Sequence, residues 1–85
     1  MANYINNQKA EADLNTEIRK RLNEWRHSCG SRAVVCERIG AKETTLKNWE
    51  KGYRQVNVLA IMAWHRNGLI SSEERDFILF GHPTL

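Results

Sequence analysis

Residues 32–51 restrict the fold more than any other part of the sequence, because they join two short amphipathic helices through a glycine. The first helix is expected to start at a cap residue, Ser31, and to run to Ile39, where Gly40 stops it. The second is expected over about residues 43–51. Only a residue or two of turn separates the helices, so they must cross at a steep angle.

The apolar side chains of these two helices are spaced to form one shared wedge. Helical periodicity places each of them on the inward face of its helix. The predicted wedge consists of Val35, Ile39, Leu46 and Trp49. Cys36, four residues before Gly40, supplies the small side chain that close contact between two crossing helices demands. Packing is the expected role of all five of these side chains.

The opposite face of the second helix carries polar side chains at positions i, i+3, i+4 and i+7, starting at Thr44. Such a stripe is an ordinary solvated face in many proteins. Here it coincides with the turn and the wedge, and its residue types read base edges: Asn pairs with adenine and Lys with guanine. The predicted base-contacting residues are Lys42, Glu43, Thr44, Lys47, Asn48 and Lys51. For Glu43, an ion pair with Lys47 at i+4 is the alternative.

Charge is concentrated in the same part of the chain. The net charge is only +3, but residues 31–54 hold six basic and three acidic side chains. A polyanion would be attracted there first. Three arginines flank the two helices and are predicted to contact phosphates: Arg32, Arg38 and Arg54. Amide groups at the helix start after Ser31 are further candidates for phosphate contacts.

The rest of the sequence predicts three more helices. Leu14, Ile18, Leu22 and Trp25 form a stripe over about residues 14–28, with Asp13 or Asn15 as cap and Gly30 as stop. Residues 1–12 lack clear periodicity and are expected to form a flexible N-terminal arm, which leaves residues 13–85 as one domain.

A fourth helix is expected from a cap at Asn57 through Arg66. Its predicted inward stripe is Val58, Leu59, Ile61 and Met62, with His65 as an optional member. The fifth runs to about Phe80 and opens with Ser71 and Glu74 at capping-box spacing. No alternating strand pattern occurs. The expected fold class is therefore all-α, a compact bundle of about five helices that contains a helix-turn-helix.

Several function classes find no support in the sequence. Cys29 and Cys36 lack the spacing of a zinc site, and the three histidines are scattered, so neither metal nor cofactor is expected. No nucleophile with a base, paired carboxylates or phosphate loop indicates an enzyme, and no catalytic residue is predicted. The polar start has no apolar signal segment, and no apolar stretch is long enough to cross a membrane. We expect a cytoplasmic protein.

Residues 32–51 resemble the helix-turn-helix of lambda-repressor-like phage regulators, the Cro and repressor proteins. More narrowly, Gly40, Leu46 and Trp49, followed by an apolar helix that ends near Trp64, resemble CII-type activators of lambdoid phages. The likeness extends over about residues 14–80, and its central twenty positions are the specific ones. Two positions depart from the pattern: Lys42 stands where many members have a capping residue, and Cys36 replaces the commoner Ala.

The resemblance implies a transcriptional regulator that binds operator DNA as a homodimer or homotetramer, associated with the bacterial nucleoid. RNA polymerase would be a further partner of an activator. By position, the resemblance assigns base contacts to Glu43, Thr44, Lys47 and Asn48, and a phosphate contact to Arg32. Trp64, Phe77 and Phe80 either complete the core or contribute to a subunit interface. The alternative function is a protein-binding helix-turn-helix module of antirepressor or antitoxin type.

Overall fold

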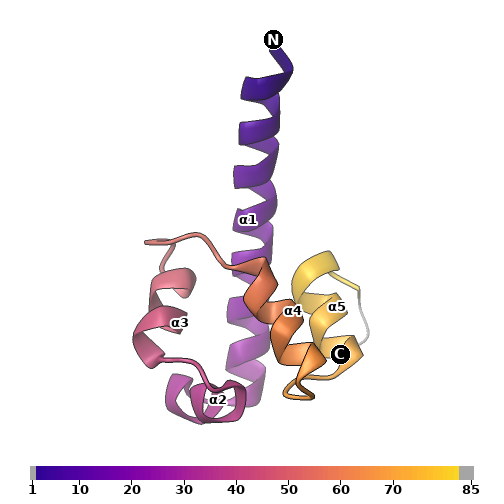
Figure 1. Cartoon of the computed structure of the whole chain (residues 1–85). Coiled ribbons are helices and arrows are strands. Elements are labelled where there is room, and N and C mark those ends of the chain that lie inside the picture. The colour runs from indigo at the N-terminus through magenta and orange to yellow at the C-terminus, as the bar shows by residue number, and fades with distance from the viewer. Residues whose placement is uncertain (1, 83–85) are drawn as a thin grey trace.

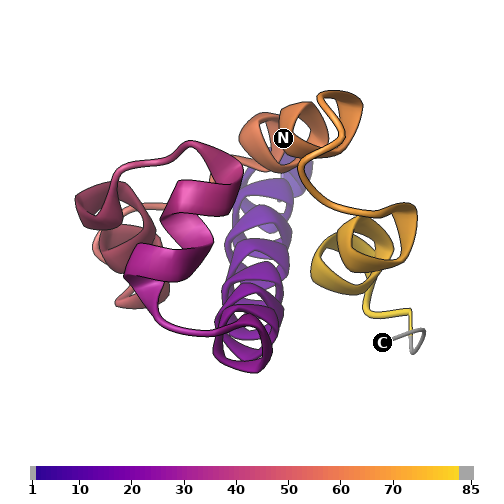
Figure 2. The same ribbon diagram turned by 90° about the horizontal axis from the view of Figure 1, so that it is seen from below.

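Five helices build the molecule, as a computed structural model that describes residues 2–82 shows, with side chains described from residue 8 onward. No strand occurs within residues 2–82, so the prediction of an all-α fold with five helices is confirmed. The five helices are α1 (Ala2–Cys29), α2 (Arg32–Ile39), α3 (Glu43–Glu50), α4 (Val58–Arg66) and α5 (Ser72–Phe80). Both α2–α3 and α4–α5 pack against the lower half of α1, on different sides of it (Figures 1 and 2).

Helix α1 is longer than the sequence predicted. It begins at Ala2 instead of near residue 14, and its N-terminal half extends beyond the other helices (Figure 1). Residues 8–12 are Gln, Lys, Ala, Glu and Ala, all good helix formers, and no Gly or Pro interrupts residues 2–29. Residues 2–12 are therefore helical, although no apolar stripe marks them.

The predicted caps of α1 serve other purposes. Asp13 and Asn15 lie inside the helix, and Asn15 instead bonds to the backbone of Val56: its amide nitrogen donates to the Val56 carbonyl, and its amide oxygen accepts from the Val56 N–H, both at 3.0 Å. Ile18, Leu22 and Trp25 are buried as predicted. Leu14, one turn earlier, is exposed.

The helices α2 and α3 end close to the predicted residues. The Ser31 hydroxyl accepts a hydrogen bond from the Val34 N–H at the start of α2, and Gly40 ends it in a left-handed conformation, φ +69°. Lys42 occupies the N-cap position of α3 without a side-chain bond to the helix. All four predicted wedge residues are buried, and so is Cys36.

The helices α4 and α5 confirm their predicted caps but correct part of the α4 stripe. Asn57 accepts from the Leu59 N–H, and Ser71 and Glu74 form the predicted capping box. Ile61 is fully buried, whereas Leu59 is 73% and Met62 50% exposed. Leu59 lies on the face of α4 opposite Ile61, and neither Leu59 nor Met62 is covered by another helix within residues 8–82.

Three tryptophans connect the helices at the centre of the core. Trp64 of α4 lies between Trp25 of α1 and Trp49 of α3, with ring centroids 6.3 and 6.0 Å away. All three side chains are buried. The position of α3 is therefore fixed by α1 and α4 as well as by its neighbour α2.

Candidate nucleic-acid interface

The outer face of α3 carries the predicted base-contacting side chains. Thr44, Lys47 and Lys51 are exposed, and Asn48 between them is half-buried. Leu46 and Trp49 point into the core from the opposite face. The side chains of α3 are thus divided as the i, i+3, i+4, i+7 spacing predicted.

The backbone of Asn48 is bonded to the chain that follows α3. Gly52 has φ +77° and turns the backbone, so that the N–H groups of Tyr53 and Arg54 both donate to the Asn48 carbonyl oxygen, at 2.9 and 3.3 Å. These bonds hold residues 53–54 against the end of α3. They also fix the backbone from which the Asn48 side chain projects.

The entrance and outer face of α3 have a positive charge that no internal partner neutralises. Within residues 8–82, Lys42, Lys47 and Lys51 form no ion pair, and all three are exposed. Glu43 is exposed as well and forms no ion pair with Lys47. Three ammonium groups therefore face solvent beside one carboxylate, which favours a polyanion as a ligand.

An ion cluster fixes α3 to α1 and α2 at the end opposite the entrance. The Glu50 carboxylate accepts from Arg26 Nη2 at 2.8 Å and Nε at 3.0 Å, and from Arg32 Nε at 3.2 Å. Arg26 and Glu50 are both buried. The hydrogen bonds to Glu50 raise the pKa of Arg26, outweighing the opposing effect of burial. The predicted phosphate-contacting Arg32 is thus engaged on one side, with its side chain still 30% exposed.

Arg38, also predicted to contact phosphate, is placed elsewhere. Its guanidinium binds both carboxylate oxygens of Glu74 in α5, at 2.6 and 3.0 Å, and donates to the Leu69 carbonyl at 3.0 Å. It also lies over the Trp25 ring, 5.9 Å from the centroid. Arg38 therefore connects α2 to α5 and is not brought to the outer face of α3.

Glu74 receives three kinds of donor. Its partial burial opposes ionisation, but hydrogen bonds from Arg38, from the Ser71 N–H and from Trp25 Nε1 outweigh this and lower its pKa to about 2. This carboxylate joins α1, α2 and α5. The sequence indicated only its capping role, because a contact 36 residues away leaves no periodic signal.

Arg54 is exposed in the connection between α3 and α4, and it lies beside a polar cleft that also contains Arg19 of α1. Sequence reasoning missed Arg19. Its only signal is its place on the polar face of α1, four residues after Asn15, and nothing in the sequence shows that this face meets the chain after α3.

The structure offers little for other chemistries within residues 2–82. No group of three metal-ligating side chains occurs there, and no helix in that range has the length and apolar character needed to cross a membrane. Burial raises the pKa of the Cys36 thiol, and Glu43 and Glu50 add to the effect. A protonated, buried thiol fits the packing role predicted for Cys36.

No family model matches the chain, and no curated protein and no solved structure is significantly similar to it.

Proposed function

We propose that this chain is a sequence-specific double-stranded DNA-binding transcriptional regulator that inserts α3 into the major groove. The observation that carries the proposal is the outer face of α3, where Thr44, Lys47, Asn48 and Lys51 project from a helix held by a buried ion cluster and a tryptophan core. The major groove of B-DNA is wide enough for one α-helix. Nothing in this role requires a cofactor or a catalytic group.

The side chains on this face contact different bases in the proposed complex. Asn48 pairs with adenine through its amide, and Lys47 donates to guanine. Thr44 offers a hydroxyl and a methyl group, and Lys42 and Glu43 meet the bases nearest the helix entrance. The backbone bonds from Tyr53 and Arg54 to the Asn48 carbonyl support a base-reading role, because they fix the point of the helix from which the amide projects.

Arg32 and Arg54 supply phosphate contacts on either side of α3. Arg32 keeps part of its guanidinium exposed while Glu50 holds it in place, and Arg54 is exposed directly after α3. Phosphate contacts of this kind fix the register of a protein on DNA without reading its sequence. Arg38 is left out of this set, because Glu74 and Leu69 already bind its guanidinium.

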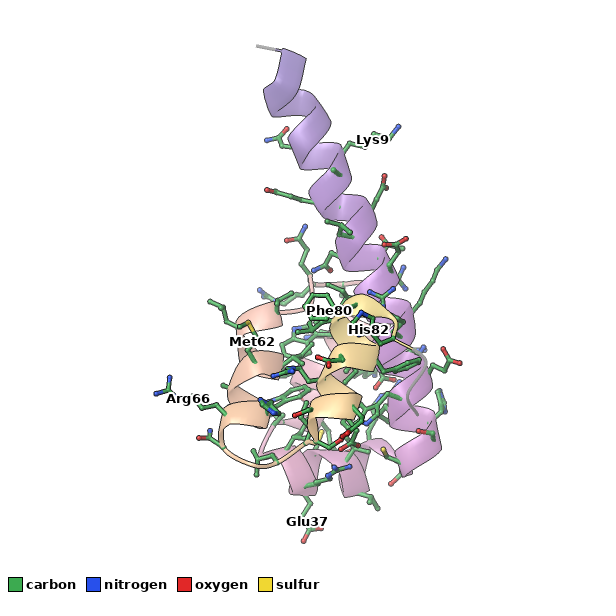
Figure 3. All side chains as sticks on the ribbon, turned by 90° about the vertical axis from the view of Figure 1, so that its right-hand side faces the viewer. Lys9, Glu37, Met62, Arg66, Phe80 and His82 are labelled. Carbon is green, nitrogen blue, oxygen red and sulfur yellow. The ribbon has the colours of Figure 1, made fainter. Side chains whose placement is uncertain are left out.

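The regulator acts as a homodimer or higher oligomer, because two-fold symmetric operators are read by two recognition helices. The subunit contact would be the apolar surface formed by Leu59, Met62 and Phe80, of which Phe80 is 64% exposed. Helix α5 lies across α1 from α3, and although Trp64 of α4 meets Trp49 of α3 in the core, Met62 and Phe80 are exposed on the side of the molecule that Figure 3 shows. Pairing there would leave both α3 helices free.

The resemblance of residues 32–51 to lambda-repressor-like phage regulators adds to this proposal. A protein of that kind acts in the cytoplasm of a bacterial host, and an activator would also contact RNA polymerase.

Selection of bound duplexes from a random DNA pool tests the proposal. The wild-type protein is expected to enrich a motif with half-sites about one helical turn apart. A Thr44→Ala/Lys47→Ala/Asn48→Ala variant should lose it. The matched control is Lys20→Ala, which removes an exposed positive charge from α1, outside α3 and outside the proposed subunit contact.

Three results would contradict the proposal. If the wild-type protein enriches no motif at low salt, this result contradicts the base-reading role and favours a protein-binding module. Equal enrichment by wild type and the triple variant moves recognition to another surface. Loss of the motif in the Lys20→Ala control as well would show that enrichment depends on net charge and not on the outer face of α3.

A further inference from the structure

The arginines of this chain fall into two groups. Five of the eight bind inside the molecule: Arg21 donates to the carbonyl oxygens of Ile78 and Leu79, and the other four pair with carboxylates, namely Arg26, Arg32, Arg38 and Arg75. Within residues 8–82, Arg19, Arg54 and Arg66 form no ion pair. Two of these three line the same cleft.

This cleft lies between α1 and the connection from α3 to α4. It has a volume of about 200 Å³. One wall comes from α1 and the other from the residues after α3, and its lining consists of Ala12, Asn15, Thr16, Arg19, Gly52, Arg54 and Gln55. No carboxylate is among these residues. A group that enters the cleft therefore meets two guanidinium groups and neutral polar side chains.

The two walls are held at a fixed separation. Asn15 bonds to both the N–H and the carbonyl of Val56, which fastens the end of the connection to α1. The Arg19 side chain lies against Gly52: a Cβ at this position would be in ordinary van der Waals contact with Arg19 Nε, at 3.5 Å. The Arg19 guanidinium thus lies beside the glycine that follows α3, half-buried and without an anionic partner among residues 8–82.

The acidic side chains of α1 nearest the cleft in sequence are Glu11, Asp13 and Glu17, and none of the three lines it. Asp13 and Glu17 are four residues apart and share a stripe about a third of a turn away from the middle of the cleft-lining positions, as a helix of 3.6 residues per turn requires. Glu11 is nearer, one turn before Asn15, at the N-terminal end of the cleft. The two guanidinium groups therefore have no carboxylate of α1 beside them in the cleft lining.

We propose that Arg19 and Arg54 together bind one phosphate of the DNA backbone in this cleft. The guanidinium group matches the geometry of phosphate oxygens and binds them through two parallel N–H donors. The cleft adjoins the C-terminal end of α3, because Gly52 and Arg54 follow that helix directly. If α3 occupies the major groove, one of the two DNA strands that border the groove would pass this cleft. The inference rests on the proposed function, and it adds α1 to the DNA-contacting surface.

The test measures DNA affinity against salt concentration, on the duplex selected above and on an unrelated duplex, for Arg19→Gln, Arg54→Gln and the double variant. Each single variant is expected to weaken binding to both duplexes by roughly tenfold, the value of a lost charge-assisted hydrogen bond. The double variant should lose little more, because both arginines hold the same phosphate. Its slope of log affinity against log salt should be shallower by about 0.9.

The matched control is Lys20→Gln, which removes one positive charge from the next residue of α1, an exposed position on another face. It should change affinity by less than about twofold, as expected of an exposed charge without a specific contact. Arg19→Lys keeps the charge without the fork of donors, and it should bind between wild type and Arg19→Gln. Thermal unfolding shows whether each variant is folded, and if Arg19→Gln is not, the exposed Arg54→Gln carries the test.

The outcomes separate this inference from the proposed function. If the wild type binds DNA through α3 but Arg19→Gln behaves like Lys20→Gln, the phosphate site is wrong and the regulator stands. Fully additive losses in the double variant would overturn the sharing of one phosphate. Inorganic phosphate that binds with the same arginine dependence, while DNA affinity is unchanged in the variants, would make the cleft a site for a free anion. A wild type that binds no DNA rejects the proposed function itself.

Discussion

Arg26 of α1 and Glu50, the last residue of α3, form a two-point ion pair in which both side chains are almost completely buried, at 9% and 2% exposure. The two residues are 24 positions apart, and the pair joins the scaffold helix to the helix that carries the candidate interface. Arg32 of α2, whose side chain is 30% exposed, binds the same carboxylate. One acid thus holds three helices in register.

We predict that Glu50→Ala lowers the free energy of unfolding by about 3–5 kcal/mol, because it leaves the buried Arg26 charge without a partner. The double variant Arg26→Met/Glu50→Leu should recover most of this loss, since no buried charge then remains. Urea unfolding of both variants measures the difference. A double variant no more stable than Glu50→Ala would show that packing, and not the unpaired charge, causes the loss.

The Glu74 carboxylate predicts a stability that depends on acid pH. Its pKa is lowered from an ordinary value of 4.5 to about 2 in the folded protein. Because the folded-state pKa is the lower one, the stabilisation is fully present above pH 4.5 and is lost as the pH falls toward 2. Urea unfolding between pH 7 and pH 2 should show this loss in the wild type and a flatter profile in Glu74→Gln.

The control for this prediction is Glu37→Gln. Glu37 is exposed on α2 (Figure 3) and forms no ion pair within residues 8–82, so its variant should follow the wild-type profile. An acid profile that Glu74→Gln leaves unchanged would mean that other carboxylates cause the acid sensitivity.

The outer face of α3 predicts two different kinds of DNA-binding variant. Asn48→Ala should relax sequence preference, costing about 1–3 kcal/mol on the preferred sequence alone, while the salt slope stays nearly unchanged. Lys51→Ala should weaken binding to all sequences and make the slope shallower by about 1 if it contacts a phosphate. Affinity measured on selected and scrambled duplexes distinguishes them, and an equal loss on both from Asn48→Ala would contradict base reading.

The exposed apolar surface on α4 and α5 predicts a variant that affects assembly but not folding. Met62→Glu should weaken self-association at least tenfold, because an unpaired charge would be buried between subunits. The unfolding curve of the isolated subunit should change little, since half of the Met62 side chain is exposed. Sedimentation over a range of concentrations is the measurement, with Gln55→Glu as a control of equal charge change. A wild type that is monomeric throughout would reject this surface as the subunit contact.

Local patterns predicted most of the fold correctly. The ends of α2 to α5 follow from capping residues and glycines that act within a few positions, such as Ser71 with Glu74 and Gly40 after Ile39. The prediction that α1 begins near residue 14 was wrong for the converse reason. Its first turns have helix-forming residues but no apolar stripe, and periodicity detects only helices that pack against something.

The remaining errors concern which partner a side chain meets. Leu59 and Met62 were predicted to belong to the apolar stripe of α4, but the sequence does not show how much of that stripe the other helices cover. Arg38 was predicted from its charge to contact phosphate, and the sequence does not show that its guanidinium also binds Glu74, 36 residues away. Arg19 illustrates the reverse case, because its surroundings depend on how α1 meets the connection after α3. Such long-range pairings become visible only in the folded chain.

The contact of Trp64 with both Trp25 and Trp49 also gives the molecule an internal optical reporter. Three indoles with neighbouring centroids 6.0 and 6.3 Å apart are close enough to couple electronically and to exchange excitation energy. A tilt of α3 against α1 or α4 would change one of these separations. Tryptophan emission and near-ultraviolet circular dichroism of the unlabelled chain would therefore register movement of α3 when its outer face is occupied.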